Sequence, residues 1–268
     1  MKIRVASYNI HKGMPTVGTR PRVHALKAAI AKLDADLVFL QEVQGRHDLH
    51  ALRHGAHWPN AAQHDFLASD QHGAAYGANA IYEHGHHGNA LLSNLPILKS
   101  QNQDISDHAY ESRGILHCVL HAPLRDQEIH CYVVHFGLFP GGRQRQSEAL
   151  IEAVKASAGI DAPVVIAGDF NDWGDHLGDH LRVALDVCEV FEAPNPAQAS
   201  TLSERLRRRR GVDALHKPAR TFPAALPMLR LDRIYVRGFQ VNAAEVMHGL
   251  HWARLSDHAP IVAEIELL

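Results

Sequence analysis

The stretch Val-Val-Ile-Ala-Gly-Asp-Phe-Asn-Asp at 164–172 constrains the fold more than any other part of the chain. Its β-branched residues predict a buried strand, and Gly168 ends that strand sharply. Asp169 and Asn171 are two positions apart, so their side chains should point the same way at the strand end. One is a carboxylate that can take a proton, and the other is an amide that donates and accepts. The stretch favours either chemistry on water or a strand followed by an Asx-turn.

Apolar patterns elsewhere predict a mixed chain of strands and helices. Pro21 opens a predicted helix whose apolar residues, three to four positions apart from Val23 to Leu33, share one face. A second helix is expected from about Gln144 to Ser157, and Glu42 should follow the end of the second strand. The further strands are expected at Ile3–Ile10, Asp36–Leu40, Asn89–Ser93, Gly114–Leu120, Ile129–His135, Leu231–Val236 and Ile261–Leu267.

The segment 44–88 has a composition of its own, rich in histidine, glycine and alanine. Nine of the 22 histidines of the chain lie between His47 and His87. We predict a short helix near Leu49–Arg53, a strand near Asp65–Ala68 and exposed loops between them. Imidazole is a good zinc ligand, but the irregular spacing favours a polar loop that faces the substrate over a single zinc site.

The composition is that of a soluble globular protein, which we interpret as one domain over residues 1–268. Hydrophobic residues make up 46% and charged residues 21%, enough for a sizeable core. The net charge of −2 gives no global positive field that would recruit nucleic acid. The three cysteines have no CxxC spacing and fit a reducing compartment. Because the chain has neither a long apolar stretch nor the apolar run of a signal peptide, we expect a cytoplasmic monomer.

Polar residues of catalytic type follow or begin several predicted strands, where function gathers on a rigid scaffold. Acidic oxygens from Glu42 and Asp257 suit a hard cation such as Mg²⁺ or Mn²⁺. Taken singly, each polar residue is also explained by a cap, a turn or a salt bridge. The joint pattern indicates a site. Its members are Asn9, Glu42, His135, Asp169, Asn171, Asp232, Asp257 and His258.

Six short motifs, in this order, resemble the endonuclease/exonuclease/phosphatase superfamily, the DNase I-like group. The match covers essentially the whole chain and is most similar to small stand-alone bacterial members. The resemblance implies an α/β (α+β) fold, a four-layer αββα sandwich in which two packed, mainly antiparallel β-sheets are flanked by helices. The motifs are Ser-Tyr-Asn-Ile at 7–10, Leu-Gln-Glu-Val at 40–43, Gly-Asn-Ala-Leu-Leu-Ser at 88–93, Gly-Asp-Phe-Asn at 168–171, Leu-Asp-Arg-Ile at 231–234 and Ser-Asp-His-Ala-Pro at 256–260.

The resemblance also implies roles for individual residues, at an edge where loops of both sheets meet. Glu42 looks like the principal metal ligand, with Asn9 and Asp257 as its near neighbours. Asp169 resembles the base that activates the attacking water, and Asn171 resembles the amide that orients it.

The phosphate side of the implied site comes from other motifs. His258 and His135 resemble residues that contact the scissile phosphate. Asp232 resembles a carboxylate that holds a histidine in one tautomer. Arg113 and Asn89 are further candidates for contact with the phosphate.

Two points stay open within the resemblance. The general base is either Asp169 or the Asp232–His258 pair. DNA-repair members commonly have an aspartate two residues after the first asparagine of the site, whereas this chain has His11 there. Whether a second metal ligand occupies that position therefore stays open.

Three functions compete. The first is a phosphodiesterase that acts on a small or lipid-linked phosphoester, with membrane lipid as substrate rather than as an anchor; the lack of a long basic stripe favours it. The second is a nuclease acting on DNA or RNA, supported by the arginine run 205–210 and by Trp58, Trp173 and Trp252, which could stack bases. We favour the plainer explanations for these residues, a solvated helix face for the arginines and core or rim packing for the tryptophans. The third is a catalytically silent binding module, against which the intact polar set argues.

Overall fold

The computed structural model describes residues 1–15, 18–68, 70, 72–193 and 219–268. Within these residues the chain forms two six-stranded sheets. The first has the order β11 (Phe239–Val246), β12 (Ile261–Leu267), β1 (Lys2–Asn9), β2 (Leu37–His47), β4 (Gly85–Ser93) and β3 (Gly73–Tyr82). The second has the order β5 (Ile97–Asp104), β6 (Gly114–Ala122), β7 (Gln127–His135), β8 (Val164–Asp169), β10 (Asp232–Arg237) and β9 (Cys188–Glu189).

The two sheets are mainly antiparallel, as expected. The parallel pairs among the described strands are β1 with β2 in the first sheet and β7 with β8 in the second. The loops that follow β1 and β2 therefore lie at one edge of the first sheet, and those that follow β7 and β8 lie at one edge of the second. This arrangement allows the ends of four strands to build a single site.

Successive side chains of each strand point alternately into the core between the two sheets and toward the helices on the outer faces. Val5 and Phe39 of the first sheet pack with Val133 and Val165 of the second in one core between the sheets. The neighbouring residues point outward, so Tyr8 packs against helices instead. Burial of apolar surface on both faces of both sheets is what stabilises the sandwich.

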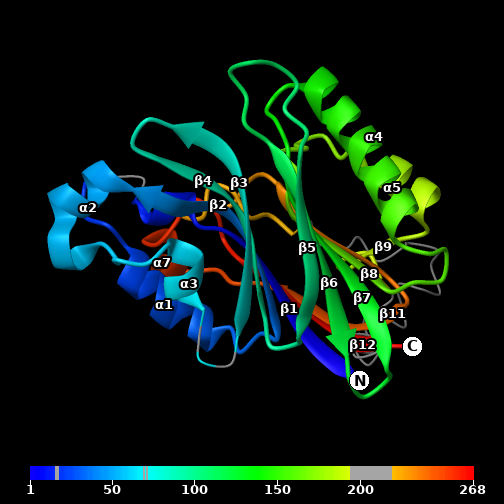
Figure 1. Ribbon diagram of the computed structural model, residues 1–268. Helices are drawn as coiled ribbons and strands as arrows, with labels where there is room; N and C mark the ends of the chain where they lie inside the picture. Colours follow the sequence, from blue (N-terminus) through cyan, green and yellow to red (C-terminus); the bar gives the residue numbers. More distant parts are fainter. Residues whose placement is uncertain (16–17, 69, 71, 194–218) are drawn as a thin grey trace.

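Helices cover the two outer faces (Figure 1). The helices α1 (Val23–Lys32), α3 (Gln63–Leu67) and α7 (Leu250–Ala253) lie against the first sheet. The helices α4 (Pro140–Ser157) and α5 (Gly178–Leu185) lie against the second. The short helix α2 (Asp48–His54) follows β2. The expected four-layer sandwich is confirmed.

Some elements differ from the sequence-based predictions. The predicted strand Asp65–Ala68 is wrong, because these residues belong mostly to helix α3, whose Leu67 is buried and whose Phe66 ring packs on His24 of α1. The exposed loops expected within 44–88 are partly strands, since β2 runs on to His47 and β3 was not predicted. Helix α4 begins at Pro140, ahead of the predicted start.

The arginine run 205–210, on which the nuclease hypothesis partly depends, lies outside the described residues. Of the helices that are described, none combines the length with the apolar character required to cross a membrane.

Candidate active site

Three neighbouring strands of the second sheet bring ionisable residues into one row. His135 of β7 is paired in register with Asp169 of β8, which is paired with Asp232 of β10. Residues that face each other across strands share a face of the sheet, and here it is the inner face. Gly168 permits this close pairing, because a Cβ on it would lie 1.9 Å from the Val134 carbonyl oxygen. The apolar core between the sheets therefore ends in a buried row of ionisable groups.

Asp169 lies at the centre of this row and is 2% exposed. Its Oδ2 atom is 3.7 Å from Nε2 of His135 and 3.7 Å from Nε2 of His258. The amide of Asn9, at the end of β1, donates to the same oxygen over 3.2 Å. Nδ1 of His258 donates to Asp232 Oδ2 over 2.9 Å. The structure thus unites residues from both sheets around one carboxylate.

Asn171 combines the two roles that its sequence position suggested. Its backbone N–H donates to Asp169 Oδ1 over 2.9 Å, which is the expected Asx-turn. Its side-chain amide donates to the Phe136 carbonyl over 2.9 Å. Its φ of 49° places it in the left-handed region, which asparagine tolerates. The turn after β8 is therefore held to the end of β7, and it fixes the direction of the Asp169 carboxylate.

The loop that carries His258 is tied to both sheets. The Ser256 hydroxyl donates to the Asn9 carbonyl over 2.7 Å, and the backbone N–H of His258 donates to that hydroxyl over 3.3 Å. The ring of Phe222 lies 5.0 Å from the His258 ring. Sequence reasoning missed Phe222, since it is a single residue in a stretch without a recognisable pattern.

Glu42 reaches the site through an irregularity of β2. Leu40 and Val43 both pack on the outer helices although they are three positions apart, and the strand register shifts between them. Glu42 itself has a φ of 54°. This β-bulge turns a side chain that would otherwise face the helices toward the catalytic edge. The Glu42 Oε2 atom there lies 3.2 Å from the Lys12 ammonium.

A left-handed turn follows Asn9. His11, Lys12 and Gly13 have φ values of 46°, 58° and 71°. His11 donates its backbone N–H to Asn9 Oδ1 over 3.1 Å, and its Nδ1 lies 3.8 Å from Asp257 Oδ1. Non-glycine residues in this region are strained and often mark functional sites. The turn brings two basic side chains beside the predicted metal ligands; the role of Lys12 was not foreseen from the sequence.

Burial and neighbouring charges separate the pKa values of the buried groups. Burial raises the pKa of Asp169 to about 6, with His258 acting against this shift and Asp232 adding to it. Burial alone would lower the pKa of His258, but Asp232 and Asp169 raise it to about 10. Of the three neighbours Asp169, Asp232 and His258, it is therefore His258 that carries the proton at neutral pH.

The pKa values of two other ionisable residues of the site, His135 and Glu42, are lowered instead. Burial, together with the Arg113 charge, lowers the pKa of His135 well below its usual value, so its ring is neutral. Burial would raise the pKa of Glu42, but the positive charge of basic side chains around it, among them Lys12, outweighs burial and lowers the pKa to about 2. Glu42 is consequently an ionised carboxylate throughout the physiological pH range.

The donor set around Asn9 fits a hard divalent cation. The Glu42 and Asp257 side chains are 19% and 24% exposed, so their carboxylates are reachable from solvent, and the Asn9 amide adds a neutral oxygen. Carboxylate and amide oxygens without thiolates are the ligands of Mg²⁺ and Mn²⁺. A second group, Asp169, Asp232 and His258, has ligand atoms within 4.8 Å of one another.

Arg113 and Asn89 lie at the margin of the site. The Arg113 Nε atom is buried without a hydrogen-bond partner, and its charge acts on His135. Asn89 is fully buried, and its amide donates to the Gly114 carbonyl of the other sheet over 2.8 Å. Asn89 therefore ties the sheets together, and its contact with a phosphate stays a prediction.

Most of the histidines of 47–87 lie in ring contacts with one another or with neighbouring aromatic side chains. His47 and His50 have ring centroids 3.8 Å apart, and His50 lies 4.8 Å from Trp58. In the described part of the chain, Asp169, Asp232 and His258 form the only group of three His, Cys, Asp or Glu side chains whose ligand atoms all lie within 4.8 Å of one another, and none of the histidines of 47–87 belongs to it. Trp58 and Trp252 are core residues, whereas Trp173 is 58% exposed.

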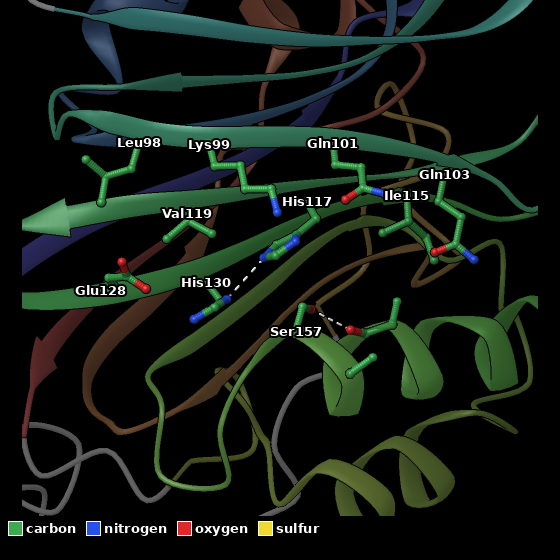
Figure 2. A pocket seen from close by; sticks show the side chains of 12 residues that line it. Leu98, Lys99, Gln101, Gln103, Ile115, His117, Val119, Glu128, His130 and Ser157 are labelled. Carbon is green, nitrogen blue, oxygen red and sulfur yellow. Dashed lines mark hydrogen bonds between the residues drawn. The ribbon is translucent and has the colours of Figure 1, made fainter.

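A groove of about 600 Å³ lies elsewhere, between the outer face of β5, β6 and β7 and helix α4 (Figure 2). His117 and His130 face each other in it, with a hydrogen bond of 3.1 Å between His117 Nε2 and His130 Nδ1. Because the buried row of His135, Asp169 and Asp232 is on the inner face of the same sheet, the groove is separate from the candidate site.

Comparisons with known proteins agree with this geometry. The sequence model of the Endonuclease/Exonuclease/phosphatase family matches residues 6–258. A protein named "Uncharacterized protein YbhP" is 40% identical over 265 residues in Escherichia coli (strain K12) and in Shigella flexneri, covering 98% of this chain and 96% of each relative.

Solved structures share the fold. A functionally unknown conserved protein from Enterococcus faecalis V583 has a TM-score of 0.72 at 18% identity, covering 99% of this chain and 100% of that chain. ANGEL2, described as a 2',3'-cyclic phosphatase in complex with adenosine-2',3'-vanadate, has a TM-score of 0.70 at 15% identity, covering 99% and 96%. The chain belongs to the endonuclease/exonuclease/phosphatase family, whose members are hydrolases that act on phosphoesters.

Proposed function

We propose that this protein is a divalent-metal-dependent phosphodiesterase that hydrolyses a small or lipid-linked phosphoester by attack of water. The observation that carries this proposal is the surroundings of Asp169 Oδ2, which has the Nε2 atoms of His135 and His258 at 3.7 Å each. One buried carboxylate oxygen thus lies between two imidazole nitrogens, the combination that can take a proton from water and donate to an anionic phosphate.

Asp169 serves as the general base in this proposal. Burial raises its pKa to about 6, which brings it close to neutral pH while leaving it mostly ionised there. His258 already holds a proton at neutral pH, because its pKa is raised to about 10, and so it is a poor base. These shifts support Asp169 over the Asp232–His258 pair. Asn171 supports the same role, since its N–H fixes the carboxylate through Oδ1.

His258 then acts as a charged donor. Its imidazolium offers Nε2–H to a phosphoryl oxygen, and Asp232 fixes the ring through Nδ1. A group that is already charged and oriented stabilises developing negative charge without reorganisation. Neutral His135 supplies a second nitrogen on the other side of Asp169, and Arg113 adds positive charge nearby.

Glu42, Asn9 and Asp257 would hold the Mg²⁺ or Mn²⁺ ion. When bound, such an ion neutralises charge on the phosphoryl group as a Lewis acid. The Lys12 ammonium beside Glu42 shows that this position already favours positive charge.

A nuclease is the second candidate. Trp173 is two residues beyond Asn171 and is 58% exposed, so its ring can stack on a base next to the site. The structurally similar ANGEL2, described as a 2',3'-cyclic phosphatase, has a bound adenosine derivative, which supports a nucleotide-containing substrate for this fold.

We further propose that the active species is a cytoplasmic monomer and that residues 1–268 form one domain. All three cysteines are free thiols in the structure, and a reducing compartment would keep them so.

An activity panel tests these proposals. Bis-aryl phosphate, phospholipid vesicles, DNA and RNA should each be incubated with Mg²⁺ and with Mn²⁺. We expect hydrolysis of the bis-aryl phosphate that stops in excess EDTA. Full activity in excess EDTA would contradict the metal requirement, and no hydrolysis of any substrate would favour the silent binding module.

A further inference from the structure

Strand β4 brings one histidine of the segment 47–87 to the catalytic edge. Leu91 of β4 belongs to the core between the sheets, and Asn89 donates its side-chain amide to the Gly114 carbonyl of the second sheet over 2.8 Å. Side chains at every second position of a strand share a face, so His87 lies on this inner face as well. The register shifts beside His87 are in the partner strands β2 and β3, which leaves the alternation within β4 intact.

The facing strand of the second sheet brings another histidine to the same level. The Asn89 amide nitrogen lies 3.4 Å from the Val133 carbonyl oxygen of β7, as well as contacting β6. Two residues toward the catalytic edge from this contact, β4 reaches His87 and β7 reaches His135. His87 and His135 therefore face each other across the space between the two sheets, one on each side of the candidate site.

Charged groups of the candidate site surround the His87 ring. Burial lowers the pKa of His87 to about 4, with Lys12 and Arg113 lowering it further and Glu42 acting against them. These three charges belong to the left-handed turn, to the loop before β6 and to the β-bulge, so His87 lies where these segments meet. Its ring is neutral at pH 7, and a neutral imidazole has one N–H that can donate a hydrogen bond.

Neither ring nitrogen of His87 has a hydrogen-bond partner in the described part of the chain. Its Nδ1 atom is buried, and its ring lies 5.9 Å from the Tyr82 ring. The neighbouring His86 is different, because its Nδ1 atom forms a hydrogen bond of 2.9 Å with the Tyr76 hydroxyl. Polar groups inside folded proteins are normally hydrogen-bonded, so an exception beside a reaction centre suggests a partner that arrives with the substrate.

We propose that His87 is a further substrate-contacting residue, which donates its Nε2–H to an oxygen of the phosphoester from the first-sheet side, opposite His135. Because the protein covers Nδ1, Nε2 is the nitrogen that a substrate can reach. Phosphoester oxygens accept hydrogen bonds, so a bound substrate selects the tautomer that carries its proton on Nε2. This inference rests on the proposed phosphodiesterase function and adds to it a binding contact that transfers no proton.

The test compares two substitutions of His87 with a control on the turn that precedes it. His87→Leu removes the donor, whereas His87→Gln keeps an amide donor near the position of Nε2. His84→Leu is the matched control, because that side chain is 44% exposed and its near neighbour is Glu83. The measurements are kcat and KM for bis-aryl phosphate at saturating Mg²⁺, the dissociation constant of inorganic phosphate by calorimetry, and the melting temperature.

We expect His87→Leu to raise both KM and the phosphate dissociation constant on the order of tenfold, as for a lost hydrogen bond to a charged group. The value of kcat should hardly change, which is the pattern of binding lost equally from the ground state and the transition state. His87→Gln should show a smaller increase in both constants, and His84→Leu should match the wild type. The melting temperatures of all four proteins should agree.

Two results would overturn the proposed contact. One is a wild-type KM and a wild-type phosphate dissociation constant in His87→Leu. The other is equal impairment of His87→Leu and His87→Gln with a lowered melting temperature, which is the sign of a purely structural role. Hydrolysis with an unchanged KM in His87→Leu would leave the proposed function standing without this contact. Phosphate binding that depends on His87 in a protein that hydrolyses no phosphoester would support the contact and contradict the proposed function.

Discussion

The two sheets contribute to the candidate site in different ways. The second sheet contributes His135, Asp169 and Asp232 from paired positions of regular strands, and all three are buried. The first sheet contributes Glu42 from a β-bulge, next to the left-handed turn of 11–13, and this carboxylate is partly exposed. Regular strand pairing therefore positions the second-sheet residues, whereas a β-bulge and a left-handed turn position the first-sheet residues.

This difference corresponds to a division of chemical work. On the second-sheet side burial raises the pKa of Asp169, and the charges of Asp232 and Asp169 hold a proton on His258 against the effect of burial, which suits proton transfer. On the first-sheet side the pKa of Glu42 is lowered to about 2, so this partly exposed carboxylate keeps its negative charge at neutral pH. Such a charge suits a cation. We therefore expect substitutions on the second-sheet side to change turnover and pH dependence, and substitutions on the first-sheet side to change the metal requirement or stability.

The largest effect is expected for Asp169→Asn. This change keeps the shape and the hydrogen bond that Asp169 Oδ1 accepts from Asn171 N–H, but it replaces the basic oxygen Oδ2 with an amide nitrogen. Turnover of bis-aryl phosphate at saturating Mg²⁺ should therefore fall by roughly 10²–10⁴-fold. The melting temperature should hardly change. Asp126→Asn is the matched control, because that side chain is 96% exposed and should give wild-type turnover. Retention of more than about a tenth of the turnover would refute the base assignment.

A smaller effect is expected for Asp232→Asn, because Asp232 acts through His258. Turnover should fall by about 10–100-fold, the range found for carboxylates that orient a metal-binding imidazole. Asp232 helps to raise the pKa of His258, so its loss lowers that pKa, and activity should disappear at a lower pH than in the wild type as pH rises. The pH–rate profile measures this shift. A loss as severe as that of Asp169→Asn, with an unmoved alkaline limb, would favour the Asp232–His258 pair as base.

Glu42→Gln tests the first-sheet side. Losing one negative charge among the proposed ligands should raise the Mg²⁺ concentration for half-maximal activity on the order of tenfold, with partial recovery at high Mg²⁺. A Mg²⁺ titration of turnover measures this, and Glu83→Gln, at a side chain 87% exposed, is the control. Wild-type behaviour of Glu42→Gln at limiting Mg²⁺ would show that Glu42 is not a ligand.

The smallest effect concerns the left-handed turn. Gly13 has a φ of 71°, and a Cβ on it would lie 2.7 Å from Gln63 Nε2 and 2.7 Å from Val23 Cγ2. Gly13→Ala should therefore lower the free energy of unfolding by about 1–3 kcal/mol. Gly159→Ala has open space around its Cβ and should change it by less than about 0.5 kcal/mol. Urea denaturation compares the two, and equal stabilities would show that the turn is not strained.

The second-sheet side was the more predictable half of the site. Short runs of buried apolar residues define β7 and β8, and His135 and Asp169 stand at the ends of these strands, so both could be predicted as strand-end residues of the site. On the first sheet, Glu42 was expected after the end of a strand, whereas the strand continues through a bulge. A bulge adds one residue without altering the apolar pattern strongly enough to be recognised.

The elements that were not predicted have weak patterns for a physical reason. Strand β5 exposes nearly every position, so no apolar alternation marks it. Strand β3 is built largely from glycine and alanine, which have low strand propensity. Lys12 could not be assigned a role, because only the left-handed backbone of its turn brings it to Glu42.

The claim that a proton resides on His258 while Asp169 is the base is tested most directly by the protonation state of the His258 ring. Nitrogen NMR of the EDTA-treated protein at about pH 8 would report it, since an unperturbed histidine is neutral there. We predict that both ring nitrogens of His258 carry protons at that pH and that the His135 ring is neutral. A neutral His258 ring under these conditions would contradict the proposed division of roles.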